Sequence, residues 1–235
     1  MSDPFKYPGE ELVLFQNATN WKKYFSRQIK PYIKGDVLEV GAGIGSTTLL
    51  LNDGSADQWL MLEPDEQLSS QLKIKLETNA LPGNCRLQSG TINHVSSKYD
   101  TIIYIDVLEH IENDVEEMKN AAGLLNADGH IIVLSPAFQF LYSPFDKVIG
   151  HYRRYNKKMI EKITPEGLQL IHNRYYDVVG YFAALINRLI LKQKYPTLKQ
   201  IRFWDKWMVP VSKIKDKLLF HSFGKSIIAI WKKEN

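Results

Sequence analysis

Residues 36–48 read DVLEVGAGIGSTT, and this stretch decides the fold. The first five residues are mostly branched and apolar, which predicts a buried β-strand. Gly41, Gly43 and Gly45 follow at alternate positions, and glycine allows positive φ and a close approach of a ligand to the backbone. Ser46 and the residues behind it predict a helix, whose first N–H groups have no partner within the helix and suit a polar ligand. A strand, a glycine turn and a helix in this order predict a nucleotide-binding loop.

The spacing of the glycines separates two kinds of nucleotide site. A dinucleotide fingerprint needs G-x-G-x-x-G, but its third glycine position is Ser46 here. A nicotinamide-dependent oxidoreductase is therefore the weaker alternative. With Glu39 two residues before Gly41, the run resembles the first motif of class I S-adenosylmethionine-dependent methyltransferases, acid-x-G-x-G-x-G. Further similarity extends this resemblance over residues 33–135.

Hydrophobic periodicity predicts an alternating order of strands and helices, which indicates an α/β fold with a doubly wound sheet. The predicted strands cover residues 36–40, 58–62, 85–88, 99–105, 129–136, 168–179 and 226–231, and the main predicted helices cover 21–29, 65–77, 109–125, 157–163 and 181–191. The resemblance implies a three-layer Rossmann-like methyltransferase fold with a mostly parallel seven-stranded sheet. In that fold the last strand is antiparallel and inserted between the fifth and sixth.

We expect one domain over residues 1–235. It comprises a leading helical segment (1–32), the core (33–180), a helical insertion or cap (181–225) and the last strand (226–235). The insertion is unusually long for this position in the resembled fold. Its apolar residues lie among lysines, so it can cap the site, form a dimer surface or lie on a membrane.

Composition is typical of a soluble globular protein, with 44% apolar and 24% charged residues. The single cysteine, Cys85, excludes an internal disulfide and a cysteine-only zinc site. No apolar run approaches the roughly 18 residues of a membrane span, and the polar N-terminus is no secretory signal, so we expect a cytoplasmic location. From Tyr181 onward the chain carries 12 Lys/Arg against 3 Asp/Glu. This basic end suits an anionic partner or membrane, or is a solvated surface.

A carboxylate is expected to bind the ribose of the cofactor. Glu63 ends the second predicted strand, 20 residues beyond Gly43, where an acid can accept hydrogen bonds from ribose hydroxyls. The family usually has an acid for the adenine amino group where this chain has Thr91, so we expect backbone groups of residues 90–92 to serve instead. The resemblance assigns S-adenosylmethionine to Glu39, Gly41, Ala42, Gly43, Gly45, Glu63, Pro64, Gly90, Thr91, Ile92, Asp106 and Val107.

The run after the fourth strand also carries a candidate metal set. Asp106, Glu109 and His110 have i, i+3, i+4 spacing and can share one helix face. With another histidine they can bind a divalent metal, as in methyltransferases with an E-x-x-E-H version of this motif. Three ligands without a defined fourth make a poor site, so we predict that no metal is bound.

Residues 150–155 read GHYRRY and follow the fifth strand, beside the expected methyl donor. Histidine has an ordinary pKa of about 6.5, which makes His151 the candidate general base. Arg153 and Arg154 can clamp a carboxylate or phosphate of the acceptor, and Tyr142, Tyr152 and Tyr155 can wall it. In the alternative interpretation this segment is a lid pinned by ion pairs, for example between Asp146 and an arginine.

The leading interpretation is methyl transfer from S-adenosylmethionine to an O or N nucleophile of a small molecule that is acidic or lipid-like. A non-catalytic methyltransferase-like binding protein stays open as an alternative. A nucleic-acid methyltransferase is disfavoured, because the run at residues 106–109 lacks the Asn/Asp-Pro-Pro-aromatic signature of enzymes that methylate base amines. The expected partner is therefore a small-molecule acceptor, with peripheral membrane contact or a homodimer through 181–225 left open.

Overall fold

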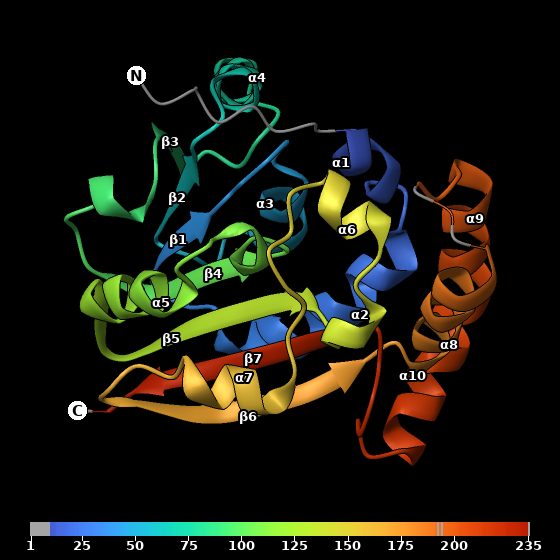
Figure 1. The fold of residues 1–235 in the computed structure, drawn as a ribbon. Helices are drawn as coiled ribbons and strands as arrows, with labels where there is room; N and C mark the ends of the chain where they lie inside the picture. The colour runs from blue at the N-terminus through green and yellow to red at the C-terminus, as the bar shows by residue number, and fades with distance from the viewer. Residues whose placement is uncertain (1–9, 192, 194, 235) are drawn as a thin grey trace.

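The computed structural model describes residues 10–191, 193 and 195–234. Its centre is a seven-stranded sheet in the order β3-β2-β1-β4-β5-β7-β6 (Figure 1). Only β7 is antiparallel to its neighbours, β5 and β6. The prediction of a last strand inserted between the fifth and sixth is therefore confirmed. The strands are β1 (Asp36–Val40), β2 (Gln58–Glu63), β3 (Cys85–Ser89), β4 (Tyr99–Ile105), β5 (Leu125–Pro136), β6 (Leu168–Tyr176) and β7 (Ser226–Lys233).

The central strands are buried on both faces, which explains their nearly continuous apolar sequences. Ile102, Ile103 and Tyr104 of β4 are each fully buried. Two apolar clusters cover the opposite faces of the sheet, one with side chains of α2, α3 and α4, the other with side chains of α5 and α7. The result is the expected three-layer arrangement (Figure 1). Around the sheet lie α1 (Glu10–Phe15), α2 (Thr19–Ile29), α3 (Ser46–Leu51), α4 (Glu66–Glu77), α5 (Asp114–Gly123), α6 (Pro144–Val148) and α7 (Lys157–Lys162).

The helix predicted after the fourth strand begins later than expected. Glu109 and His110 lie in a separate 3₁₀ turn, η3 (Leu108–His110), and α5 begins only at Asp114. Asn113 explains the later start, because its side chain caps the helix by accepting a hydrogen bond from the Glu116 N–H. The prediction of one helix that begins at Glu109 is therefore wrong. Strand β5 begins at Leu125, four residues before the predicted strand over residues 129–136.

The segment after β5 contains a helix that the sequence analysis did not predict. This helix, α6, is short and begins with a capping box in which Ser143 and Asp146 satisfy each other's backbone N–H groups. Pro144 occupies the first helical turn, where its missing N–H costs no hydrogen bond. The local signals of a helix start were thus present in the run Ser143–Asp146.

The insertion between β6 and β7 is helical, as predicted. It contains α8 (Val178–Ile186), the π-helix η5 (Asn187–Leu191), and then α9 (Leu198–Phe203), the π-helix η6 (Trp204–Met208) and α10 (Val209–Leu218). The last three are consecutive and form one continuous helix. These elements stand together at the right-hand edge of Figure 1, beyond the arrowhead of β6. Among the residues that the structure describes, no helix is both long and apolar enough to cross a membrane.

Buried aspartates fasten the insertion to the core. Asp205 accepts hydrogen bonds from two backbone N–H groups in the first turn of α2, at 2.8 and 3.0 Å. Asp216 accepts one from the Tyr24 hydroxyl at 2.9 Å, and Asp177 accepts one from the Trp204 indole at 2.7 Å. Because a carboxylate without partners is costly to bury, these bonds fix the position of each helix against the core.

Candidate active site

A cavity of about 500 Å³ lies at the carboxyl ends of β1, β2, β4 and β5. Open parallel sheets bind their ligands at this edge. Helices α1 and α2 and the segment around α6 form the rest of its wall. The cavity is large enough for a nucleoside-sized cofactor together with part of a second molecule. Of the twelve residues that the sequence assigned to S-adenosylmethionine, all except Glu39 and Gly45 line it. Gly45 instead packs against α4, where a Cβ atom would lie 2.9 Å from Leu72 Cδ2.

The glycine loop presents its backbone to the cavity. Gly43 has a φ of +56°, and a Cβ atom there would approach only the Leu12 side chain, at 3.4 Å. Gly41 is needed for a different reason, because a Cβ atom there would lie 2.6 Å from Val107 Cγ2. The first glycine therefore lets the loop after β1 pack against the loop after β4, and the second lets a ligand approach the chain.

Glu63 connects the glycine loop to the end of β2. One carboxylate oxygen accepts a hydrogen bond from the Gly43 N–H at 2.7 Å, and the other accepts one from the Asp65 N–H at 3.0 Å. The side chain is 4% exposed but still lines the cavity. Burial raises the pKa of this carboxyl, while both backbone bonds lower it. Each oxygen keeps a lone pair for a further donor, such as a ribose hydroxyl.

Glu39 occupies a different place from the one expected. Its carboxylate does not line the cavity but lies behind the glycine loop, 2% exposed. One oxygen accepts hydrogen bonds from the Thr48 hydroxyl at 2.6 Å and the Trp59 indole at 2.7 Å. Burial raises the pKa of Glu39 to about 7, although both bonds lower it. Glu39 thus joins β1, α3 and β2 beneath the loop.

The loop after β4 forms the middle of the cavity wall. Asp106 has a φ of +54°, a conformation that aspartate tolerates better than most residues. Its backbone N–H donates to the Leu134 carbonyl at 2.8 Å. Desolvation by the surrounding protein raises the pKa of its carboxyl to about 6, although the residue stays accessible from the cavity, and nearby His151, Lys225 and Lys22 lower this pKa. Val107 and residues 90–92 also line the cavity, as predicted.

A network of charged side chains forms the other end of the cavity. The His151 Nδ1 atom lies 2.9 Å from Asp146 Oδ1, and Arg154 binds both oxygens of the same carboxylate, at 2.7 and 2.9 Å. Ser143 donates to Asp146 from its N–H and its hydroxyl, both at 2.8 Å. Hydrogen bonds from the histidine and arginine hold the pKa of Asp146 well below its usual range, against the opposing effect of burial. The ion pair expected of a pinned lid is therefore present.

Two buried polar atoms at this end have no hydrogen-bond partner among the described residues. They are Arg154 Nη1 and Glu109 Oε1. Both residues line the cavity, and Glu109 Oε1 lies 3.7 Å from His151 Nε2. Burial raises the pKa of Glu109 well above its usual range, and Asp106 nearby acts in the same direction. Buried polar atoms in native proteins are nearly always paired, so a bound water molecule or a polar ligand can complete the hydrogen bonding at this end of the cavity.

The same corner contains the candidate metal ligands. Glu109, His110 and His151 offer ligand atoms that lie within 4.8 Å of one another, whereas Asp106 is not in this group. Burial and the neighbouring His151 lower the pKa of His110 to about 3, so its ring is neutral at ordinary pH. The structure thus supplies the histidine that the sequence left undefined, but it adds no fourth protein ligand from the described residues. The absence of a bound metal stays a prediction.

Four of the predicted acceptor residues do not line the cavity. Tyr155 is buried, and its hydroxyl donates to Asp114 at 2.7 Å. Arg153 pairs with Asp114 at 2.6 Å and donates to the Glu112 carbonyl at 2.5 Å. Tyr152 is 52% exposed, and Tyr142 donates to the His151 carbonyl at 2.6 Å. The sequence pattern could not show that Arg154 faces the cavity and the other residues do not, because residues 151–154 form an irregular loop without a helix or strand period.

Several cavity residues lie outside the predicted set. The aromatic wall consists of Phe15, Phe25, Phe145 and Trp204, which come from four separate elements. Lys225 precedes β7, and its ammonium lies 4.1 Å from the centroid of the Trp204 ring. The sequence shows only that the four aromatic positions are apolar, which is typical of ordinary core residues, and that Lys225 is one of many basic residues near the C-terminal end.

Comparison with known proteins identifies the family. A family model described as "Methyltransferase domain" matches residues 16–178, which is more than half of the chain. The chain belongs to this methyltransferase family. The resemblance of the glycine loop is thereby confirmed, and the chain is an S-adenosylmethionine-dependent methyltransferase. The nicotinamide-dependent and non-catalytic alternatives lose their support.

Solved structures of low sequence identity share the fold of this methyltransferase. An S-adenosylmethionine-dependent methyltransferase from Clostridium acetobutylicum ATCC 824 is 13% identical with a TM-score of 0.58, over 93% of this chain and 92% of that chain. The N-methyltransferase NodS from Bradyrhizobium japonicum WM9 is 12% identical with a TM-score of 0.54, over 97% and 98%. The cyclase SpnF is 11% identical with a TM-score of 0.62, over 96% and 94%. Since one of these structures is named for a different reaction, the acceptor chemistry must be argued from the cavity itself.

Proposed function

We propose that this methyltransferase transfers the methyl group of S-adenosylmethionine to an O or N nucleophile of a small molecule that carries an anionic or oxygen-rich group. One observation carries the proposal. A single cavity joins a glycine loop and Glu63 at one end to His151, Asp146 and Arg154 at the other. The first end suits a nucleoside, and the second suits a polar group that must lose a proton.

The residues of the first end fit the cofactor. Gly43 leaves room for a ligand, and the Glu63 oxygens retain acceptor capacity for ribose hydroxyls. The remaining proposed contacts are Gly41, Ala42, Pro64, Gly90, Thr91, Ile92, Asp106 and Val107, which all line the cavity. Glu39 supports the loop from behind, and Gly45 lets the loop pack against Leu72. When bound, S-adenosylmethionine supplies an electrophilic methyl group. The chain contributes alignment of the two reactants and exclusion of water.

His151 is proposed as the general base. Its Nδ1 atom is held by Asp146, which leaves Nε2 toward Glu109 and the cavity. A histidine fixed in this way can accept a proton at Nε2 from the acceptor, and the Asp146 carboxylate stabilises the imidazolium that forms. Asp146 acts through His151 and Arg154 and is therefore a positioning residue.

The acceptor class follows from the unpaired atoms and the aromatic wall. Arg154 Nη1 is a cationic donor, and burial raises the pKa of Glu109, which favours the protonated carboxyl that can also donate. Both atoms therefore suit oxygen atoms of the acceptor, such as those of a carboxylate or phosphate. Phe15, Phe145 and Trp204 offer an apolar surface for the rest of the molecule. The proposal includes a small-molecule partner and keeps the cytoplasmic location expected from the sequence.

A methyl-transfer assay tests the proposal. Purified protein is incubated with isotope-labelled S-adenosylmethionine and a panel of small carboxylates, phosphates and amphiphilic alcohols or amines, and mass spectrometry detects the labelled product. We expect an acidic acceptor to be methylated by the wild type and not by His151→Ala, which should still bind the cofactor. Equal turnover by both proteins would contradict the role of His151. Methylation of uncharged acceptors alone would contradict the role of Arg154.

A further inference from the structure

The long helix of the insertion has two apolar faces. One is buried against the core and includes Trp204 of the cavity wall. The other faces outward and contains five large side chains at helical spacing, each between 45% and 65% exposed. These are Phe203, Trp207, Val211, Ile214 and Leu218. Exposed apolar surfaces of this size and continuity mark interaction sites rather than ordinary protein surface.

A second helix of the insertion, next to the first, also carries exposed apolar side chains. Helix α8 packs against α10, and α8 continues directly into η5. Phe182, Ile186, Leu189 and Ile190 lie at helical spacing along α8 and η5 and are 49% to 72% exposed. We call the nine exposed residues of the two helices the apolar lobe. The lobe stands at one edge of the molecule in Figure 1.

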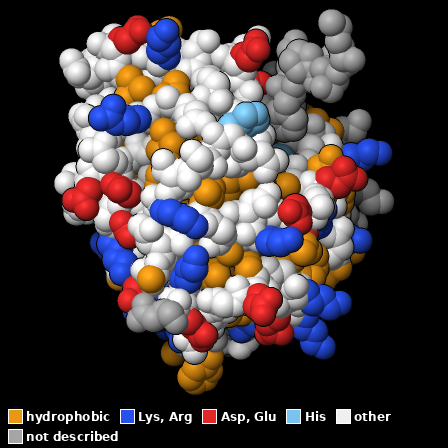
Figure 2. Space-filling model, turned by 90° about the vertical axis from the view of Figure 1, so that its left-hand side faces the viewer, with side chains coloured by type: hydrophobic (Ala, Val, Ile, Leu, Met, Phe, Trp, Pro, Cys, Tyr) orange, Lys and Arg blue, Asp and Glu red, His pale blue; other side chains and the backbone are white. Residues whose placement is uncertain are grey.

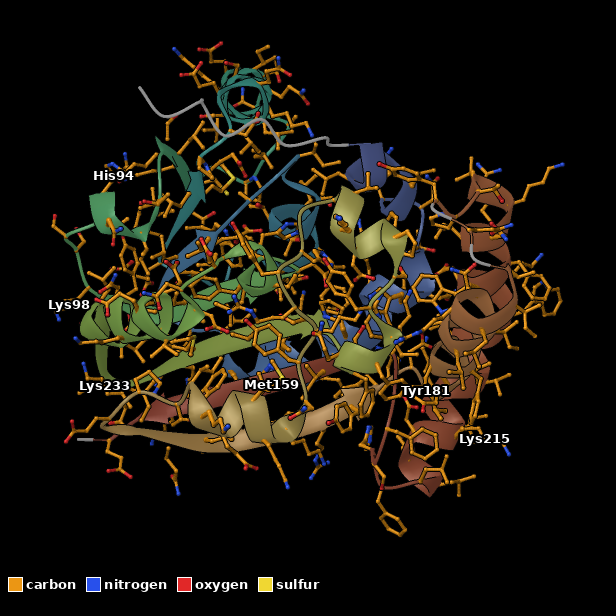
Figure 3. All side chains as sticks on the ribbon, in the orientation of Figure 1. His94, Lys98, Met159, Tyr181, Lys215 and Lys233 are labelled. Atoms are coloured by element: carbon orange, nitrogen blue, oxygen red, sulfur yellow. The ribbon has the colours of Figure 1, made fainter. Side chains whose placement is uncertain are left out.

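The charges around the apolar lobe have one sign. Residues 181–220 contain nine Lys/Arg and two Asp/Glu. The two acidic residues are Asp205 and Asp216, both buried and hydrogen-bonded to α2. The basic side chains of the long helix are exposed or half-buried, and Lys215 points away from the sheet in Figure 3. By contrast, the face in Figure 2 carries acidic and basic side chains next to one another.

We propose that the apolar lobe docks on the surface of a bilayer that contains anionic lipids. A helix with an exposed apolar stripe and a basic polar face is the pattern of helices that lie in a membrane interface. Tryptophan is enriched at this level of a membrane, and each Lys or Arg near an anionic surface contributes about 1 kcal/mol. A second copy of the chain fits less well, because its lysines would face those of the first with no exposed acid on the lobe to pair them.

Tryptophan fluorescence offers a direct test. Of the five tryptophans in the chain, Trp207 is 60% exposed, whereas the other four are at most 8% exposed. Vesicles of phosphatidylcholine and phosphatidylglycerol in equal parts are titrated into the full-length protein. We expect a blue shift of the emission, and we expect Trp207→Phe to abolish the shift while retaining vesicle co-sedimentation. Raising the salt concentration should weaken binding, and pure phosphatidylcholine should bind weakly.

Matched substitutions locate the surface. Ile214→Glu should reduce the fraction that co-sediments with anionic vesicles about tenfold or more, because it places a charge in the apolar stripe. Ile74→Glu on α4, at a position of similar exposure, should leave it unchanged. Lys206→Gln should weaken binding about fivefold, with Lys73→Gln on α4 as the control.

Two results would overturn the proposal. One is equal vesicle binding by Ile214→Glu and Ile74→Glu when both proteins have native circular dichroism. The other is that the wild-type protein does not bind anionic vesicles. This result would overturn the proposal even if ultracentrifugation showed a dimer that Ile214→Glu dissociates. Since these measurements need neither cofactor nor acceptor, their outcome is independent of the proposed methyl transfer.

Discussion

The two ends of the cavity are built in different ways. The cofactor end is mainly the backbone of one short loop, Gly41–Gly45, with a single carboxylate beside it. The acceptor end consists of charged side chains from three segments, with Asp146 bonded to His151, Arg154 and the backbone of Ser143. The first end depends on local conformation, and the second depends on each member of a network. Substitutions should therefore reduce affinity at the first end, and both stability and turnover at the second.

The largest effect is expected at the centre of the acceptor network. Asp146→Ala leaves the buried Arg154 guanidinium and the His151 ring without their shared partner. Removing one partner of a buried ion pair costs about 3–5 kcal/mol of unfolding free energy. Urea denaturation of both proteins measures this loss.

An exposed ion pair provides the control for Asp146→Ala. The Asp53 side chain pairs with Lys30 at 3.0 Å but is 53% exposed, so Asp53→Ala should cost at most about 1 kcal/mol. Equal losses for the two variants would show that the Asp146 network contributes no more than a surface pair. The stated difference between the two ends of the cavity would then be wrong.

His151→Ala should separate chemistry from cofactor binding. Removal of a general base typically slows turnover by about 10²–10⁴-fold. Steady-state assays with the acceptor that the panel identifies would measure this, and the affinity for S-adenosylmethionine should stay within about twofold because His151 lies at the other end of the cavity. Tyr152→Ala is the neighbouring control, since Tyr152 is exposed and outside the cavity lining. Loss of turnover in Tyr152→Ala would show that Tyr152 belongs to the acceptor site, as the sequence predicted.

Glu39→Gln tests whether the acid before the glycine loop is structural. The folded protein holds the pKa of Glu39 at about 7 because of burial, above the ordinary value of 4.5. Between pH 4.5 and 7 the folded state therefore binds more protons than the unfolded state, so stability falls as pH rises through this window. The pKa difference corresponds to roughly 3 kcal/mol.

Glutamine keeps an acceptor oxygen for Thr48 and Trp59 but cannot ionise. The free energy of unfolding of both proteins is measured in urea at pH 5 and pH 8. From pH 5 to pH 8 it should fall less for Glu39→Gln than for the wild type. If both proteins lost the same stability between pH 5 and pH 8, a group other than Glu39 would be responsible for the pH dependence. A large loss of S-adenosylmethionine affinity would show that Glu39 contacts the ligand after all.

Particular residues show how much of this molecule the sequence predicts. The bounds of β1 and β4 agree with the predicted strands, because each is rich in branched and apolar residues and ends at a polar or glycine-containing loop. Glu63 was found from its distance along the chain to the glycine loop, since a strand and a helix of ordinary length fix that spacing. Glu39 was misplaced, because a strand places alternate residues on opposite faces and the motif does not say which face meets the ligand.

The acceptor end was predicted less well. The Asp146–Arg154 pair was only an alternative, because contacts between side chains in an irregular segment depend on its path in space. Glu109 was predicted only as a candidate metal ligand, although the structure buries it with one oxygen bonded to Ser135 and the other 3.7 Å from His151 Nε2. Trp204 and Lys225 come from the far end of the chain. Nothing in their local sequence distinguishes them from core and surface residues.

Calorimetric titration with S-adenosylmethionine tests the central claim most directly. Wild type, Glu63→Ala and His151→Ala are compared, with Glu66→Ala as an exposed acidic control three residues beyond Glu63 and NADH as the control ligand. We expect micromolar binding of S-adenosylmethionine by wild type, His151→Ala and Glu66→Ala, an affinity roughly 10- to 100-fold lower for Glu63→Ala, and no binding of NADH. Equal affinity of wild type and Glu63→Ala, or binding of NADH alone, would contradict the assignment of the glycine-loop end to this cofactor.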